Sequence, residues 1–393
     1  SRLDPARRSF LIAKEVSTMK NHTYDYDVLI IGAGPGGIFS AYELTKIAPE
    51  LKIAVFETGN ELKKRRCPID GDKIKTCINC KSCSIMSGFG GAGAFSDGKY
   101  NITNNFGGDL YNFVGDEPAI ALMRYVDKIN LEFGGEGARI YSTVDSDLKR
   151  RALQCDLHML DAQVRHLGTE RNYYILENII KFVSEYVDIK YYTEVSDVAP
   201  CSAGWHVTCE NAEEYEAKYV VIATGRSGSK WTSELCDKFG ISDTNNRVDI
   251  GIRFECPAEI WEPITNQVYE SKIMYRSPKT RSVCRTFCMN PHGEVVAENT
   301  NGIVTVNGHS YDDPALYTQN TNFALLVTHK FTEPFKDSNL YGEHVAALTN
   351  MLAGGVMVQR FGDLLEDRRT NEKRLRESFT RPTLDASPGN LAL

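Results

Sequence analysis

The chain has 393 residues, of which 42% are hydrophobic and 25% are charged, a composition typical of a globular protein with two or three packed units. Its net charge of -7 argues against a nucleic-acid surface, because phosphate binding requires clustered lysine and arginine in excess. No apolar run reaches the roughly 18 residues that a membrane-spanning helix needs. We therefore expect neither a nucleic-acid partner nor a membrane span.

The N-terminal segment looks separate from the rest of the chain. Residues 1–18 precede Met19, which resembles a natural start, and they lack the apolar core of a secretory signal. We predict that residues 1–23 are a leader or an expression-derived extension. Eleven cysteines without a secretory signal indicate thiols, metal ligands or redox groups in a cytoplasmic protein rather than a disulfide framework.

The strongest pattern lies between Tyr26 and Glu57. An apolar strand leads into the turn GAGPGG, a helix follows, and a second strand ends at Glu57. Gly32 permits the tight turn, Gly34 lets the backbone approach a pyrophosphate, and Gly37 lets the helix pack on the strand. The helix N-terminus favours phosphates, and Glu57 can accept hydrogen bonds from both hydroxyls of an adenosine ribose. This combination predicts a dinucleotide-binding βαβ unit rather than an ordinary tight turn.

A second glycine-rich stretch, GFGGAGAFSDGK, begins at Gly88. Glycines among small apolar residues suit a backbone pressed against a flat ligand or a second phosphate. A buried hairpin corner is the alternative. Ser96, Asp97 and Lys99 follow, and each could contact the ligand or simply cap a turn.

The remaining chain shows alternating helical and strand patterns. Helical periodicity covers 116–140 and 155–186, with Gly168 ending one helix and Thr169 starting the next. A strand and a β-meander follow and return to a buried strand that ends in Ala223-Thr224-Gly225. From residue 231 onward, short strands and long loops predict an inserted mixed-sheet domain, and 342–361 predicts a helix ending in a glycine-rich turn.

Four cysteines are spaced as C-x9-C-x2-C-x2-C: Cys67, Cys77, Cys80 and Cys83. Thiols at this spacing can reach one centre, as in zinc or iron–sulfur sites. Two alternatives stay open. Cys77 and Cys80 could cycle as a dithiol, or all four could be thiols without a role.

Candidate proton donors or carboxylate binders are His166, Arg253, Arg285, His292 and His309, and we take Arg285, His292 and His166 as weak catalytic candidates. Each of these side chains also has an ordinary explanation as a surface or core-edge residue. No Ser-His-Asp set and no paired carboxylates can be recognised, so hydrolysis has no support from the sequence.

Together these residues resemble the FAD-dependent oxidoreductases of the two-dinucleotide-binding-domain flavoprotein superfamily. The chain is similar in particular to the uncharacterised FAD-dependent dehydrogenase family over roughly residues 24–385. The matching segments are CPIDGDKIKTCINCKSC, GFGGAGAFSDGK, RHLGTE, VDIGIRFE, RTFCMNPHGEVV, VNGHS and NFALLV.

The resemblance implies an α/β fold, with a Rossmann-like FAD-binding domain (central parallel sheet plus β-meander) and an inserted mixed α+β substrate domain. It implies domains at 24–230 (FAD) and 231–380 (substrate), with 381–393 starting a return to the FAD domain. It also implies that Val195 places backbone at the adenine. The expected FAD-binding residues are Gly32, Gly34, Pro35, Gly37, Glu57, Gly90, Gly91, Ala92, Ser96, Asp97, Lys99, Val195, Ala223, Thr224 and Gly225.

The superfamily usually ends with an AAGDG-like segment whose aspartate contacts FAD, whereas this sequence stops at PTLDASPGNLAL, and we expect a truncated chain. The expected activity is transfer of a hydride or electron pair between flavin and a small organic substrate. The alternatives are alkene reduction or hydroxylation of a prenyl or aromatic substrate, and a non-catalytic flavin or metal-binding sensor or assembly protein. No second GxGxxG is evident, so the electron partner is expected to be transiently bound NAD(P)H or a redox protein.

Overall fold

The computed structural model describes residues 23–391 apart from 70–72, 75–77, 79, 145, 203, 245, 301, 312, 333 and 336. The chain divides into two compact units. Unit 1 comprises the described residues of Ser1–Ala94 together with Glu177–Asp243, and unit 2 comprises those of Phe95–Leu176 together with Thr244–Leu393.

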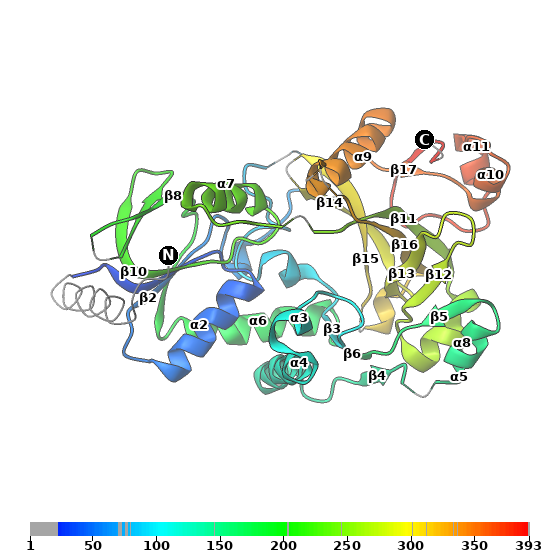
Figure 1. Ribbon diagram of the computed structural model, residues 1–393. Coiled ribbons are helices and arrows are strands. Elements are labelled where there is room, and N and C mark those ends of the chain that lie inside the picture. The colour runs from blue at the N-terminus through cyan, green and yellow to red at the C-terminus, as the bar shows by residue number, and fades with distance from the viewer. Residues whose placement is uncertain are drawn as a thin grey trace. The chain divides into compact units, whose positions relative to one another are not determined.

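Unit 1 is built on a six-stranded sheet. Its elements are β1 (Tyr26–Ile31), α2 (Pro35–Ile47), β2 (Ile53–Phe56), β7 (Val187–Lys190), β8 (Val195–Pro200), β9 (Trp205–Cys209), β10 (Glu214–Ile222) and α7 (Ser229–Phe239). The strand order is β7-β2-β1-β10-β9-β8, in which the first four strands are parallel and the last three form an antiparallel meander. Figure 1 shows α2 alongside these strands. The predicted Rossmann-like parallel sheet and meander are therefore confirmed.

The core of unit 1 explains why these segments are strands. All four residues of β2 are buried, and β1 is buried except for Asp27. A strand buried on both faces must be apolar along its whole length, as VLII and IAVF are. Tyr26 and Phe56 meet edge to face in this core, with ring centroids 6.1 Å apart. The rigid central strands thereby fix the turn that follows β1.

Unit 2 contains several smaller sheets. Its strands are β3 (Lys99–Ile102), β4 (Ile140–Ser142), β5 (Leu157–Met159), β6 (Gln163–His166), β11 (Val248–Pro257), β12 (Ile273–Arg276), β13 (Val283–Asn290), β14 (Glu294–Thr300), β15 (Ile303–His309), β16 (Asn320–His329), β17 (Met357–Val358) and β18 (Ser387–Pro388). The largest sheet is antiparallel with the order β11-β16-β13-β12-β5. One face of it buries apolar side chains such as Met159, and the other carries polar ones, the alternation expected of a half-solvated antiparallel sheet.

The helices of unit 2 are α3 (Tyr111–Val114), α4 (Asp116–Asn130), α5 (Asp147–Leu153), α8 (Ala258–Val268), α9 (Ser338–Ala353), α10 (Phe361–Leu365) and α11 (Glu372–Arg376). Helix α6 (Thr169–Val183) begins in unit 2 and ends in unit 1. None of the helices in the described part of the chain has the length and apolar character needed to traverse a bilayer.

The expected helix at 155–186 is wrong in its first half. Residues 157–159 and 163–166 form β5 and β6, and only the part from Thr169 is helical. The apolar residues at 157, 159, 162 and 164 can satisfy either period, and pairing of β5 with β12 and of β6 with β3 selects the extended form. The helix expected at 342–361 is observed as α9 at Ser338–Ala353, so the predicted bounds are wrong at both ends. The glycine-rich turn that was expected to end it does so, with Gly354 in the left-handed conformation.

Candidate cofactor-binding site

The glycine-rich turn after β1 is set by close backbone packing. Gly32 has φ +103°, and a Cβ added there would lie 2.5 Å from the carbonyl oxygen of Ala223 at the end of β10. A Cβ on Gly37 would overlap the carbonyl oxygen of Gly32. These two glycines are therefore demanded by the fold itself.

Gly34 differs from them. It precedes the first residue of α2 with φ -74° and ψ -177°, a backbone conformation open to any residue. The nearest atom to an added Cβ is Gly91 Cα at 4.0 Å. The first-turn N–H groups of Gly36 and Gly37 have no acceptor one turn earlier in the helix, as at every helix N-terminus. The turn thus offers free space beside amide donors and the positive end of the helix dipole, a setting that suits a phosphate.

Glu57, at the end of β2, is 6% exposed and is held by backbone amides. The N–H of Ala33 donates to its Oε2, and those of Gly59 and Gly88 donate to its Oε1, each at 2.8 Å. A carboxylate can accept about four hydrogen bonds. About one acceptor position is therefore left for a ribose hydroxyl, and Glu57 also fastens the second glycine-rich loop.

That second loop lies against the first one. The N–H of Gly90 donates to the carbonyl of Ala33 at 2.8 Å. A Cβ on Gly91, which has φ +56°, would come within 3.1 Å of Gly34 Cα. Gly91 also opens a short 3-10 helix that includes Ala92. The structure thus brings Gly90 and Gly91 close to Gly34, and the predicted ligand contact of this stretch stays a prediction.

Arg65 holds the second loop in shape, and sequence reasoning missed it. Its side chain donates to the carbonyl oxygens of Phe89 (2.6 Å), Gly91 (2.8 Å), Ile85 (2.6 Å) and Ser84 (2.9 Å). Arg65 is only 3% exposed, although it stands in the run KKRR that suggests a solvated basic surface. No local pattern separates it from Arg66 beside it.

Segment 190–195 runs beside Glu57. The N–H of Glu57 donates to Lys190 O at 2.8 Å, and the N–H of Thr193 donates back to Glu57 O at 2.9 Å. Val195 begins β8 two residues later and packs partly buried against the sheet core. The chain expected at the adenine therefore starts next to the residue expected at the ribose.

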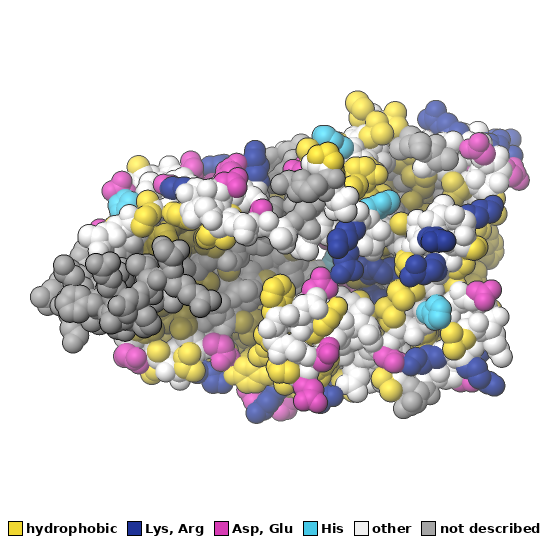
Figure 2. Space-filling view, viewed as in Figure 1, with side chains coloured by type: hydrophobic (Ala, Val, Ile, Leu, Met, Phe, Trp, Pro, Cys, Tyr) yellow, Lys and Arg dark blue, Asp and Glu magenta, His cyan; other side chains and the backbone are white. Residues whose placement is uncertain are grey.

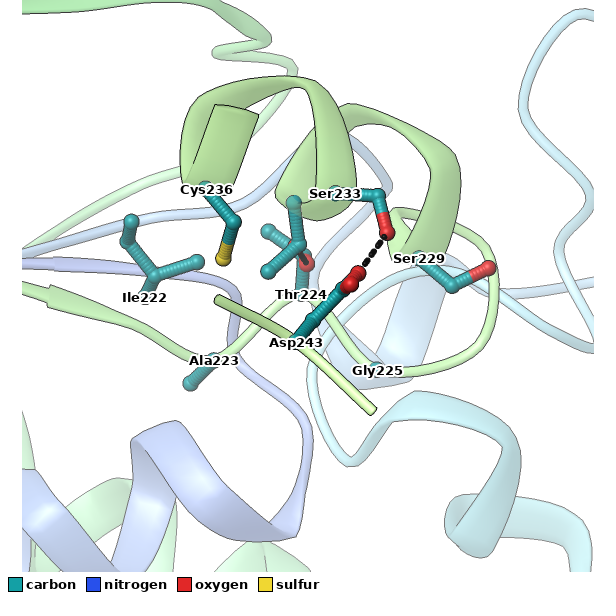
Figure 3. Close-up of a pocket in the computed structure, with 9 residues that line it drawn as sticks. Ile222, Ala223, Thr224, Gly225, Ser229, Ser233, Cys236 and Asp243 are labelled. Carbon is teal, nitrogen blue, oxygen red and sulfur yellow. Dashed lines mark hydrogen bonds between the residues drawn. The ribbon is translucent and has the colours of Figure 1, made fainter. Parts of the chain in front are cut away.

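A cavity of about 330 Å³ opens where β10 ends (Figure 3). Ala223, Thr224 and Gly225 line it, together with side chains of α7 and Asp243. Ser233 donates to Asp243 Oδ2 at 2.9 Å across this cavity. Three of the predicted FAD residues thus border free space of a size known for ligand pockets.

The other predicted residues, Ser96, Asp97 and Lys99, belong to unit 2. There Asp97 and Lys99 join a group of buried and half-buried polar side chains that we call the unit 2 polar cluster: Asp97, Lys99, His166, Arg253, Tyr269, Glu270, Lys272, Asn290, Asn307, Ser310 and Asn322. Lys99 Nζ lies 2.9 Å from Asp97 Oδ2 and 3.6 Å from Glu270 Oε2. It also donates to Met289 O at 2.6 Å and Asn290 Oδ1 at 3.0 Å.

The charged groups in this cluster shift one another's pKa values. Burial alone would raise the pKa of Glu270, but the ammonium groups of Lys99 and Lys272 lower it to about 2. Burial likewise opposes the charged form of Lys99, yet the carboxylates of Asp97 and Glu270, together with Cys288, hold its pKa well above the ordinary value. For Lys272, burial outweighs its ion pair with Glu270 and lowers the pKa. The cluster therefore keeps compensating charges in a site removed from water.

His166 is the one catalytic candidate inside the cluster. The Tyr269 hydroxyl lies 2.8 Å from His166 Nε2 and donates to Ser310 Oγ at 2.8 Å, and the two rings stack with centroids 4.2 Å apart. Burial raises the pKa of Tyr269. Tyr269 has φ +56°, a strained conformation for an aromatic residue. Such strain is commonest at functional sites.

Arg285 and His292 lie elsewhere in unit 2. Arg285 pairs with Asp249 on the polar face of the large sheet. His292 stacks on Tyr317 with centroids 5.1 Å apart, and its Nδ1 is 3.2 Å from Thr318 O. His309 is largely buried, and burial lowers its pKa. The structure therefore does not gather the catalytic candidates at one point.

Sequence reasoning also missed Tyr269, Glu270 and Lys272. They precede β12 in the segment YESKIMYR, where a charged pair leads directly into an apolar strand. That placement is the one local signal that could have singled them out.

The cysteine prediction stays a prediction. Cys67, Cys80 and Cys83 lie in the described part of the chain, and Cys80 and Cys83 carry free thiols there, while Cys77 lies outside the described residues. Among the residues that the structure describes, no group of three or more His, Cys, Asp or Glu side chains is arranged to hold a metal ion.

Comparison with known proteins gives one family match and several solved structures of low similarity. No curated protein matches. Solved structures that match include NikD, an amino acid oxidase of nikkomycin biosynthesis (13% identity, 82% of this chain and 76% of that chain, TM-score 0.35). Glycine oxidase from Geobacillus kaustophilus also matches, with 16% identity over 91% of this chain and 99% of that chain and a TM-score of 0.33. Halogenase PltM in complex with phloroglucinol and FAD matches with 13% identity over 81% of this chain and 55% of that chain and a TM-score of 0.37. The chain thus spans about half of the halogenase.

The family model "Pyridine nucleotide-disulphide oxidoreductase" matches residues 26–235, more than half of the chain. The matched range contains both glycine-rich loops, Glu57 and the strand β10, which leads into Ala223. FAD is the cofactor of this family. The chain therefore belongs to the pyridine nucleotide-disulphide oxidoreductase family and is an FAD-dependent oxidoreductase.

Proposed function

We propose that the protein is a dehydrogenase of the uncharacterised FAD-dependent dehydrogenase family, which moves a hydride or electron pair between flavin and a small organic substrate. FAD, when bound, supplies the electron chemistry at its isoalloxazine ring. The first and second glycine-rich loops would hold the pyrophosphate, Glu57 the ribose, and the start of β8 the adenine. The surroundings of these residues in unit 1 fit that role, because they combine open space, amide donors and a helix N-terminus.

Gly34 carries this proposal. Its backbone conformation is ordinary, and no protein atom lies closer than 4.0 Å to a Cβ added there. The fold alone would accept the Cβ of alanine at this position. A glycine is explained if a pyrophosphate occupies the space beside it, as in other dinucleotide-binding turns.

The test is the FAD content of Gly34→Val, measured from the flavin absorption of protein purified with added FAD. We expect a folded protein that retains less than about a tenth of the wild-type FAD, because the branched side chain fills the phosphate position. Gly36→Ala is the matched control, since its Cβ would meet only Ala223 Cβ at an ordinary 3.6 Å. Wild-type FAD content in Gly34→Val would refute the assignment.

The proposal extends to further residues, to the domain limits, to the electron partner and to the location of the protein. Ser96, Asp97 and Lys99 are proposed to act at the flavin or pyrophosphate, and Thr224 and Gly225 beside the cofactor. The domain limits of 24–230, 231–380 and 381–393 belong to the same proposal. NAD(P)H or a redox protein is the proposed electron partner. A cytoplasmic location belongs to the same proposal.

A further inference from the structure

The guanidinium of Arg253 in β11 is incompletely satisfied. Its Nη1 donates to Asn322 Oδ1 and to Cys288 O at 3.2 Å, and its Nη2 donates to Asn307 Oδ1 at 3.2 Å. The buried Nε–H has no acceptor among the described residues. The same is true of the Nδ2 of Asn322, a residue that is completely buried. Buried donors without acceptors are rare in folded proteins and call for an explanation such as a bound molecule.

Both donors belong to one face of the large antiparallel sheet of unit 2. Arg253 pairs with Ala324 in β16, and Ala324 pairs with Phe287 in β13, so the three side chains form a row on one face. Asn322 lies two residues from Ala324 and therefore on the same face. Gly251, two residues before Arg253, is exposed on that face as well. The residue directly opposite Arg253 in β16 is therefore Ala324, which has no long side chain, and Gly251 and Glu255 flank Arg253 on its own strand.

The far end of the row is aromatic and cationic. Phe287 is 38% exposed although it points away from the apolar core of unit 2. Lys272 Nζ lies 4.1 Å from the centroid of its ring, and the guanidinium of Arg285 lies 5.2 Å from it. An exposed ring on the polar face of a sheet can stack against a flat apolar body.

Arg253 differs from the neighbouring cationic side chains in having no carboxylate partner among the described residues. Lys99, Lys272 and Arg285 each have a carboxylate partner. Arg253 has none within ion-pair distance in the described part of the chain, and its contacts are neutral amide and carbonyl oxygens. The hairpin between β12 and β13 adds the exposed cations Arg276, Lys279 and Arg281. Figure 2 shows Lys and Arg side chains gathered over these strands. Such a field attracts anions.

We propose that Arg253 and Asn322 bind the carboxylate of a small organic acid whose flat, apolar body lies along Ala324 toward Phe287. The Nε and Nη2 edge of a guanidinium is a planar fork that matches a carboxylate. The unpaired donor atoms, Arg253 Nε and Asn322 Nδ2, can donate to the oxygens of such a carboxylate. That this acid is the substrate rests on the proposed dehydrogenase function, but its binding does not.

Benzoate is the probe, with neutral benzamide as its isostere, in thermal-unfolding titrations of the full chain. Benzoate should raise the Tm with increasing concentration, because a ligand of the folded state stabilises it by mass action. Benzamide should not. In Arg253→Lys, which keeps the charge but loses the fork, benzoate affinity should fall by about tenfold or more. Arg151→Lys makes the same exchange at an exposed arginine of α5 and should bind as the wild type does.

Phe287→Ala gives a second test that leaves the buried polar groups in place, and benzoate affinity should fall several-fold. Equal shifts with benzoate and benzamide, no shift at all, or unchanged affinity in both Arg253→Lys and Phe287→Ala would overturn the proposal. FAD content is measured on the same preparations and in Gly34→Val. Wild-type FAD content in Gly34→Val, together with benzoate binding as predicted, would count against the cofactor assignment alone. Loss of FAD in Gly34→Val, together with no benzoate shift in the wild type, would count against the carboxylate site alone.

Discussion

Arg65 shows how one buried side chain can define a loop that has almost no side chains of its own. Its guanidinium donates to four carbonyl oxygens between Ser84 and Gly91. A glycine-rich segment loses much conformational entropy on folding and has few contacts to offset that loss. Arg65 supplies directional bonds from a rigid planar group, and Glu57 anchors the same loop through the amide of Gly88.

We predict that Arg65→Met lowers the free energy of unfolding by at least about 3 kcal/mol, because it leaves several buried carbonyls unpaired. The urea midpoint measures the stability loss, and FAD content should fall in parallel because the second loop loses its shape. Arg66→Met is the control, since Arg66 is exposed. Equal stability of the two variants would show that the loop holds its shape without Arg65.

At the scale of elements, the unit formed by β1, the turn and α2 contains two adjacent glycines, Gly36 and Gly37, and only one of them lacks space for a side chain. Gly37 lies against the carbonyl of Gly32, whereas Gly36 has ordinary space. We predict that Gly37→Ala destabilises the protein by more than about 3 kcal/mol, because backbone must move. Gly36→Ala should be neutral or stabilising by about 0.5 kcal/mol. Thermal unfolding of the two variants checks this, and a stable Gly37→Ala would contradict the packing described.

The sequence allowed the first βαβ unit, the meander and a mixed-sheet region after residue 231 to be predicted, since each combines a clear period with turn residues at its ends. The helix expected at 155–168 failed because its apolar residues fit both periods, so that pairing with distant strands decided the outcome. The glycines and Glu57 were predictable as well, because their spacing has a local mechanical reason.

Tertiary contacts between distant residues were not predictable from one sequence. Lys99 donates to Met289 O, 190 positions along the chain, and the partners of Arg253 come from β13, β15 and β16. Asp97 and Lys99 were noted as possible ligands of a cofactor, but their ion pairs with one another and with Glu270 depend on how unit 2 folds.

For the molecule as a whole, the buried charges of unit 2 predict a loss of stability in acid. The pKa of Glu270 is about 2 in the folded state, below its ordinary value of 4.5. A lowered folded-state pKa contributes stability that is fully present above pH 4.5 and is lost as the pH falls from 4.5 toward 2. We predict that the urea midpoint falls over this range in the wild type.

Glu270→Gln should be less stable at neutral pH, because Lys99 and Lys272 lose a buried partner, and its urea midpoint should change less between pH 4.5 and 2. Glu259→Gln, at an exposed position of α8, is the control and should follow the wild type. A Glu270→Gln profile parallel to that of the wild type would assign the acid sensitivity to other carboxyl groups.

The pairing of β10 has a consequence for handling the protein. β9 pairs with β10 only from Glu214 to Ala217, so the outer side of Lys218–Ile222 meets no other strand of the described chain. Tyr219 and Ile222 are exposed there. Such an edge can template pairing with an identical edge of another molecule, and Lys218 is the one charge that opposes it. Aggregation on concentration should therefore start at this strand, and a second lysine in place of Tyr219 should delay it.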